Sequence, residues 1–270
     1  MGAMRRFLAA TFTAVTLIAS GTGAASAAQD QQVSVAPEYT GNSAMAVVYS
    51  DGTWSGTSDA KESRPALSLS KIYLGYWVLY NGTQEEKDMV EDMIRYSDNE
   101  VATMLDTKYP YAIEDITRRF ALTATERGES WGETVTSAWD VAKFVSGIQN
   151  DPNAWPILDG METAADTAAD GFAQDFGTST LPGAKGTKFA WSDDGTSATG
   201  SVTFGDGWTA AALTWGGPEA NTYDVQHGLL GDEVEAPAGD EDAPEETTNP
   251  DAPELIIDDI TGALDVLRRA

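Results

Sequence analysis

The sequence predicts an α+β protein in which one antiparallel sheet packs against helices. Three observations predict this class. Residues 45–57 read as two short strands joined by an Asp51-Gly52 turn. Residues 68–149 carry several helical patterns, and residues 185–215 read as three strands with an Asp-Gly pair at each turn. A chain that opens and closes with strands is typical of a sheet in which the first hairpin joins the last strands.

The helical middle begins with a segment that is apolar on all sides. After Lys71, residues 72–80 are aromatic or aliphatic apart from Gly75, which indicates a helix buried in the middle of the domain. The Asn81-Gly82 pair ends this helix, and Thr83 with Glu86 forms a capping box for the next one. Further helices are expected at residues 99–106, 112–121 and 137–149.

Composition excludes several kinds of function. The 270 residues include 43 Asp and Glu against 16 Lys and Arg, for a formal net charge of −27. Such a surface repels a phosphate backbone, so nucleic acid is not an expected partner. The sequence has no Cys and a single His, which excludes thiolate chemistry and mechanisms that need two histidines. The acidic run lacks calcium-loop spacing, and we expect no metal and no organic cofactor.

The N-terminus predicts export. Arg5 and Arg6 precede an apolar run over residues 7–19 and an Ala25-Ser26-Ala27 site, the pattern of a signal peptide cleaved after Ala27. The apolar run is short for a membrane span, which needs about 20 residues. We therefore expect residues 1–27 to be a signal peptide, residues 28–44 a linker, and the protein to be secreted or held in the cell envelope. A cell-envelope component is a candidate partner, and the sequence indicates no oligomeric state.

The remaining boundaries follow from composition. Residues 45–218 form the predicted folded domain. Residues 219–253 are acidic and rich in Pro and Gly, so they are expected to be disordered. Residues 254–270 form a predicted amphipathic helix with Ile256, Ile260 and Leu264 on one face. We expect this last helix to fold back over the sheet or to bind another molecule.

Ser68 and Lys71 are the first candidates for chemistry. Residues three apart share one helix face, so both would lie together at the start of the buried helix. Burial favours an uncharged lysine amine, which can accept a proton from serine, and the helix end offers N–H groups to an oxyanion. The alternative is an ordinary helix cap beside a surface lysine. A second S-x-x-K, at Ser58 and Lys61, lies in a polar loop and is set aside.

Two further motifs lie downstream. Ser97-Asp98-Asn99 lies between helices, where a hydroxyl can relay a proton and an amide can hold a carbonyl; the alternative is a capping box of Ser97 with Glu100. Lys185-Gly186-Thr187 opens a strand, where the lysine can bind a carboxylate or tune the relay serine. The alternative is a charged edge residue that discourages aggregation.

In order and context, these three motifs resemble the penicillin-recognising serine acyl-transferases, which comprise class A β-lactamases, D-alanyl-D-alanine carboxypeptidases and transpeptidases. The resemblance covers roughly residues 45–216. It implies the β-lactamase/transpeptidase-like fold, with a reduced helical subdomain because only 29 positions separate Ser68 from Ser97. It also implies a peptide or β-lactam-like substrate.

The resemblance assigns roles to the motif residues. Ser68 would be the acylated nucleophile and Lys71 its general base. Ser97 would pass the proton to the leaving nitrogen, Asn99 would bind the substrate side-chain amide, and Lys185 would hold the electrostatics of the relay. The backbone N–H groups of Ser68 and Lys188 would form the oxyanion hole.

The sequence departs from the family pattern at two places. The family has Lys-Thr-Gly or Lys-Ser-Gly, whereas Gly186 offers no hydroxyl here, and Thr187, on the same strand face as Lys185, is the substitute for binding a substrate carboxylate. The loop over residues 125–133 lacks the family's Leu-Asn pair. Its Glu126 and Glu129 are more typical of solvated side chains than of a deacylating base, and Trp131 is expected to line a cleft.

Two functions remain open. One is a secreted serine hydrolase or acyl-transferase that is acylated at Ser68 and acts on a peptide or lactam amide. The other is a catalytically silent cell-envelope binding protein that keeps the fold. A hydrogen bond between the Lys71 amine and the Ser68 hydroxyl would favour the enzyme, and a bulky side chain filling the cleft above Ser68 would favour the binding protein.

Overall fold

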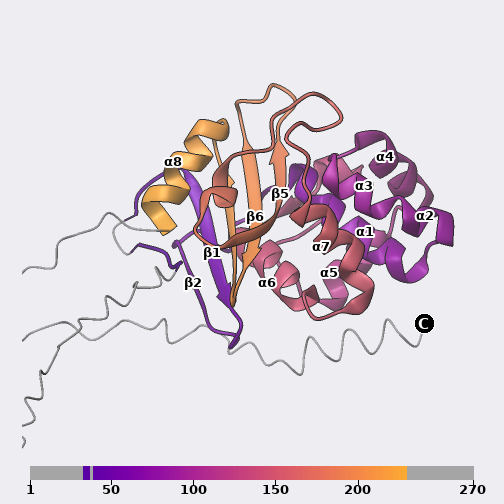
Figure 1. The fold of residues 1–270 in the computed structure, drawn as a ribbon, viewed down its shortest axis with the longest axis horizontal. Helices are drawn as coiled ribbons and strands as arrows, with labels where there is room; N and C mark the ends of the chain where they lie inside the picture. The colour runs from indigo at the N-terminus through magenta and orange to yellow at the C-terminus, as the bar shows by residue number, and fades with distance from the viewer. Residues whose placement is uncertain (1–32, 37–38, 230–270) are drawn as a thin grey trace, which may run out of the picture. The chain divides into compact units, whose positions relative to one another are not determined.

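The computed structural model describes residues 33–36 and 39–229 (Figure 1). The predicted signal peptide, residues 28–32 and 37–38 of the predicted linker, residues 230–253 and the predicted final helix lie outside the described residues. None of the helices in the described ranges has the length and hydropathy that a membrane crossing requires.

A five-stranded antiparallel sheet forms the centre of the fold. Its order is β2-β1-β7-β6-β5, where β1 is Ser43–Tyr49, β2 Trp54–Gly56, β5 Ala184–Trp191, β6 Thr199–Gly205 and β7 Trp208–Thr214. The first hairpin joins the late strands through β1 and β7, with Val47 opposite Ala210. This confirms the predicted sheet. β5 lies at the edge, so one of its sides is free to face a site.

The helices lie on both faces of this sheet (Figure 1). One face carries α6 (Ala138–Ile148) and, beyond it, the helices that the 68–149 pattern predicts, with α7 (Trp155–Glu162) added. Those helices are α1 (Ser70–Asn81), α2 (Gln84–Asp88), α3 (Val90–Arg95), α4 (Asn99–Lys108) and α5 (Ala112–Arg119). The other face carries α8 (Pro218–Leu229).

Short elements complete the chain. The 3-10 turns are η1 (Leu67–Leu69), η2 (Trp131–Glu133), η3 (Pro152–Ala154) and η4 (Gly177–Thr180). A second, two-stranded sheet pairs β3 (Arg64–Pro65) with β4 (Val135–Thr136). It connects the segment before η1 to the loop that carries η2.

The core follows the two faces of the sheet. Along β1, Ala44, Ala46 and Val48 pack with the helices around α1, whereas Met45 and Val47 pack beneath α8. Side chains alternate between the faces of a strand, so a strand covered on both sides reads as a continuous apolar run. Helix α1 is buried from Ser70 to Leu79, as its apolar sequence predicts.

Helix α8 corrects one predicted boundary. Residues 219–229 belong to the segment expected to be disordered, yet they form a helix with Val225 and Leu229 buried. Its polar residues are also satisfied, since Asp224 accepts a hydrogen bond of 2.7 Å from the Ser43 hydroxyl. Gly228 and Gly231 weaken the helical pattern of this segment in the sequence, and the contact between Asp224 and Ser43 forms only in the folded chain.

Part of the predicted linker is ordered as well. The backbone N–H of Ala36 donates to the carbonyl of Gly228 at 2.7 Å, and Val33 is buried beside Leu229. The described body therefore extends beyond residues 45–218 at both ends.

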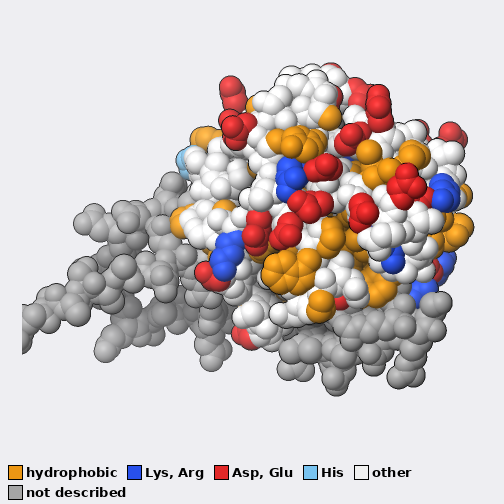
Figure 2. Space-filling view, turned by 45° about the vertical axis from the view of Figure 1, so that its right-hand side comes forward, with side chains coloured by type: hydrophobic (Ala, Val, Ile, Leu, Met, Phe, Trp, Pro, Cys, Tyr) orange, Lys and Arg blue, Asp and Glu red, His pale blue; other side chains and the backbone are white. Residues whose placement is uncertain are grey.

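Acidic side chains are spread over the face shown in Figure 2, with Lys and Arg between them in smaller number. This surface agrees with the net charge of −27.

Candidate active site

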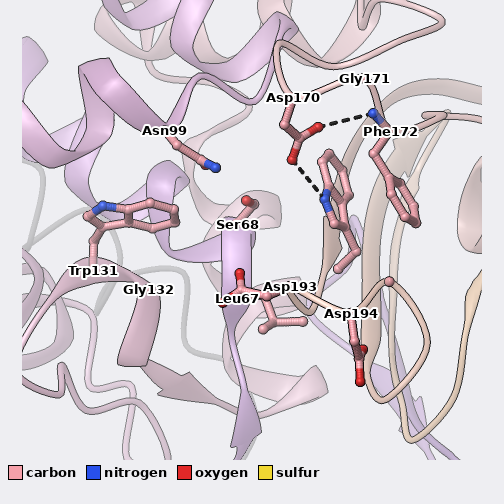
Figure 3. A pocket seen from close by; sticks show the side chains of 12 residues that line it. Leu67, Ser68, Asn99, Trp131, Gly132, Asp170, Gly171, Phe172, Asp193 and Asp194 are labelled. Atoms are coloured by element: carbon pink, nitrogen blue, oxygen red, sulfur yellow. Dashed lines mark hydrogen bonds between the residues drawn. The ribbon is translucent and has the colours of Figure 1, made fainter.

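A cavity of about 470 Å³ lies between the helices and the end of β5. Figure 3 shows Ser68 near its centre, with Asn99 and Trp131 on one side and Asp170 and Phe172 on the other. The helix side contributes Leu67, Ser68, Asn99, Trp131 and Gly132. The strand side contributes Asp170, Gly171, Phe172, Trp191, Asp193, Asp194 and Gly195.

The fold places Ser68 at the turn that leads into α1. Ser68 belongs to η1 and is 7% exposed, so its hydroxyl is held at the base of the cavity. The preceding residue, Leu67, has φ of 52°, a left-handed conformation that costs energy for a side chain of this size. One helical turn further on, Lys71 is completely buried, and its Nζ lies 2.8 Å from the Ser68 Oγ.

The surroundings of Lys71 suit an uncharged amine. Its Nζ also lies 2.9 Å from the Ser97 carbonyl oxygen and 2.6 Å from Asn99 Oδ1. A neutral amine has two N–H donors, one for each of these oxygens, and a lone pair that can accept the Ser68 hydroxyl proton. Burial lowers the pKa of Lys71 to about 7, although the charges of Asp170 and Asp98 oppose this shift.

A second buried lysine completes the cluster. The Nζ of Lys188 donates to Ser97 Oγ at 2.8 Å and to the Phe189 carbonyl at 2.9 Å. The Ser97 hydroxyl, which is 3.2 Å from Lys71 Nζ, therefore lies between two amines. Burial, together with the nearby Lys71, holds the pKa of Lys188 well below its usual value.

The structure brings Ser68, Lys71, Ser97 and Asn99 together as predicted, but not Lys185. The placement of Lys185 beside the relay serine is wrong: its exposed side chain pairs with Asp206 at the strand edge, which is the alternative considered for it. Lys188 takes the predicted place. The Lys188 side chain points towards the helices, on the same face of β5 as Ala190. A register shift between Ala184 and Gly186 interrupts the regular alternation of side chains, so Lys185 does not follow it.

Two other assignments on β5 change with it. Thr187 does not reach the cavity, because its hydroxyl bonds to Thr203 at 2.7 Å on the α8 side of the sheet. Lys188 enters the cluster through its side chain, whereas the prediction used its backbone N–H. The residue three positions after the buried lysine is Trp191, and this residue lines the cavity.

The Ser97-Glu100 capping box is also wrong. The cap of α4 is Asp98, whose carboxylate accepts hydrogen bonds from the N–H groups of Glu100 and Val101. Ser97 has φ of 52°, and this left-handed turn leaves its side chain free to face the lysines.

The loop over residues 121–137 brings Trp131 to the cavity, as predicted. Its ring lies 4.3 Å from Lys71 Nζ. Two hydrogen bonds between the Arg127 guanidinium and the carboxylate of Asp106, at 2.8 and 2.7 Å, hold the loop against α4. Neither Glu126 nor Glu129 is among the residues that line the cavity.

The segment between α7 and β5 carries site residues that no sequence motif indicates. Asp170 accepts hydrogen bonds of 3.1 Å from Trp191 Nε1 and from the Phe172 N–H, shown as dashed lines in Figure 3. No motif marks this segment, because its contacts with β5 depend on the tertiary fold. Across residues 33–36 and 39–229, no cluster of three or more His, Cys, Asp or Glu side chains could hold a metal ion.

The sequence matches no protein-family model and no curated protein. Solved structures do match. A β-lactamase from Chitinophaga pinensis superimposes with a TM-score of 0.57 at 13% identity, covering 70% of this chain and 93% of that one. A class A β-lactamase from Mycobacterium abscessus has a TM-score of 0.53 at 14% identity, and the match covers 70% of this chain and 92% of that one. Penicillin-binding protein D2 from Listeria monocytogenes has a TM-score of 0.54 at 17% identity, and the match covers 71% of this chain and 97% of that one. The chain therefore has the α+β fold of the β-lactamases and penicillin-binding proteins.

Proposed function

We propose that the protein is an exported serine hydrolase or acyl-transferase that is acylated at Ser68 and acts on a peptide or lactam amide. The observation that carries this proposal is the 2.8 Å contact between the buried Lys71 amine and the Ser68 hydroxyl. A nucleophile needs a base within hydrogen-bond reach, and this base has a pKa lowered to about 7. Export is proposed from the signal-peptide pattern alone.

In the first step, Ser68 Oγ forms a bond to the substrate carbonyl carbon as its proton moves to Lys71 Nζ. The backbone N–H of Ser68 and that of Trp191 are the proposed oxyanion donors, by the same three-residue spacing from the strand lysine. The carbon–nitrogen bond then breaks, and the Ser97 hydroxyl passes a proton to the leaving nitrogen and regains one from Lys71 Nζ, 3.2 Å away. Lys188, 2.8 Å from Ser97 Oγ, positions this relay.

In the second step, water or an acceptor amine attacks the ester on Ser68 and restores the free hydroxyl. The cavity places no carboxylate from the 121–137 loop beside Ser68, because Trp131 and Gly132 occupy that side. We therefore propose slow deacylation, with an acyl-enzyme that lasts long enough to be detected.

The test is intact-mass spectrometry after incubation with an uncharged fluorophosphonate. The expected result is one adduct, located at Ser68 by peptide mapping and absent from Ser68→Ala. An unlabelled wild type with an intact fold, or an equal adduct on Ser68→Ala, would rule out the proposed nucleophile.

The second candidate is a catalytically silent binding protein of the cell envelope. The Trp131 ring over Lys71 favours it, because this ring covers part of the amine from the cavity side. On this reading the wild type stays unlabelled, while its melting temperature still rises on binding a ligand in the cavity.

A further inference from the structure

The cavity wall across from the helices is acidic. Asp170, Asp193 and Asp194 all line the same cavity as Ser68, and all three side chains are exposed. Exposed carboxylates carry negative charge at neutral pH. This acidic group lies in the same cavity as the nucleophile, so its charge faces any substrate that approaches Ser68.

The three carboxylates are held differently. Asp170 is fixed by Trp191 Nε1 and the Phe172 N–H, each at 3.1 Å. Asp194 accepts hydrogen bonds from the Ser197 hydroxyl and from the N–H groups of Thr196 and Ser197 within its own turn, and these bonds lower its pKa. Asp193 is exposed at the rim. Two negative charges are therefore fixed in place, and a third is free to meet a ligand.

No positive charge on the wall offsets this group. Among the described residues, no Lys or Arg side chain lines the cavity. The nearest amines, on Lys71 and Lys188, are buried and bonded to Ser97, and burial lowers the pKa of both. A substrate carboxylate would thus meet repulsion without a fixed cationic partner.

Strand β5 also fails to supply a hydroxyl for a carboxylate. The residue after the buried lysine is Phe189, which packs against Phe176 with ring centroids 5.2 Å apart. Thr187 is turned to the other face of the sheet and bonded to Thr203. Neither residue lines the cavity in the described part of the chain.

The same wall is suited to a neutral or positive group. Phe172 and Trp191 stack with centroids 4.6 Å apart and an interplanar angle of 8°, beside Asp170. Aromatic faces attract cations, and adjacent carboxylates add to that attraction. Apolar neutral groups are accepted by the same surface through burial.

We propose that Ser68 is acylated by donors whose group beside the scissile bond is neutral or positively charged. Asp170 and Asp193 select against donors that carry a carboxylate at that position. The inference rests on the proposed function, because it concerns the donor that acylates Ser68.

The test uses three probes of one scaffold on the full chain: a penicillin, its methyl ester and its 2-aminoethyl amide. Ring opening forms the bond from Ser68 Oγ to carbon, breaks the lactam carbon–nitrogen bond and leaves the serine proton on nitrogen, so the whole probe mass is added. At low salt, the ester and the cationic amide should acylate Ser68 at least about tenfold faster than the carboxylate. Salt should narrow this gap by screening exposed charges.

Variants separate charge from reactivity. Asp193→Asn and Asp170→Asn should each raise the rate ratio of the carboxylate probe to the ester several-fold. Glu85→Gln removes the same charge from exposed α2, outside the cavity, and should leave that ratio unchanged. Should Asp170→Asn perturb folding, Asp193→Asn carries the test, because no hydrogen bond of its side chain is broken.

The outcomes are distinct. If the ester and the carboxylate label Ser68 equally, or the carboxylate labels it faster, this inference is overturned and the proposed function stands. If no probe and no fluorophosphonate labels the folded protein, the proposed function falls and this inference falls with it.

Discussion

At the scale of single residues, the site depends on the protonation state of two lysine amines that both contact the Ser97 hydroxyl. Ser97 Oγ is 3.2 Å from Lys71 Nζ and 2.8 Å from Lys188 Nζ. Both lysines are fully buried, where an ammonium is poorly solvated. Sequence reasoning could predict the lowered pKa of Lys71, because its helix is apolar on every side. It could not predict Asp170, whose charge reaches both lysines only in the folded chain.

The pH dependence of acylation tests this state. The reaction needs the neutral Lys71 amine, so its rate should rise with pH and level off above a midpoint near the pKa of about 7. Asp170 raises that pKa, so Asp170→Asn should move the midpoint to lower pH. The measurement is the rate of fluorophosphonate labelling across pH 5 to 10. A midpoint near 10, or no shift in the variant, would contradict it.

At the scale of elements, strand β5 shows why a motif and a fold can disagree. Lys185-Gly186-Thr187 is the better match to the family's letters, yet the buried lysine is Lys188, which Phe189 follows. A register shift between Ala184 and Gly186 interrupts the regular alternation of the strand at Lys185, so this lysine does not share the face of Lys188. Both lysines belong to the same short strand, and the packing of helices such as α7 beside β5 determines which lysine enters the site.

The two lysines of β5 form a matched pair for mutation. Lys188→Met keeps most of the side-chain volume but removes the amine from Ser97, and it should slow acylation by about 100-fold, the scale of a lost proton-transfer group. Lys185→Met breaks only an exposed pair with Asp206 and should leave the rate within about twofold. Acylation rates measured beside melting temperatures check this. Equal losses in both variants would contradict the assignment of Lys188.

At the scale of the whole molecule, α8 closes the sheet. It covers Met45, Val47 and Ala210, an apolar face that the helices around α1 cannot reach. The five strands, their membership of one antiparallel sheet and most helices could be predicted from turns, caps and periodicity. The closing helix could not, since residues 221–231 are short and hold two glycines, and the pairing of Asp224 with Ser43 depends on residues far apart in the chain.

Two truncations test this role. A chain ending at Gly217 lacks α8 and should fail to fold, because it exposes the second apolar cluster to water. A chain ending at Gly231 keeps α8 and should keep its melting temperature within a few degrees. Thermal unfolding measures both. A large loss in the longer chain would instead support the expectation that residues 254–270 fold back over the sheet.

The left-handed backbone at residues 67 and 97 affects the stability of the chain. Leu67 precedes Ser68, and Ser97 carries the second hydroxyl of the cluster; Leu67 and Ser97 each have φ of 52°. Such residues cost about 1–3 kcal/mol each and persist only where their surroundings enforce them. The strain at these two residues therefore lowers the free energy of unfolding, while it directs the Ser68 and Ser97 side chains towards one point. A protein that did not need to orient these two hydroxyls would be more stable with both residues in an unstrained backbone conformation.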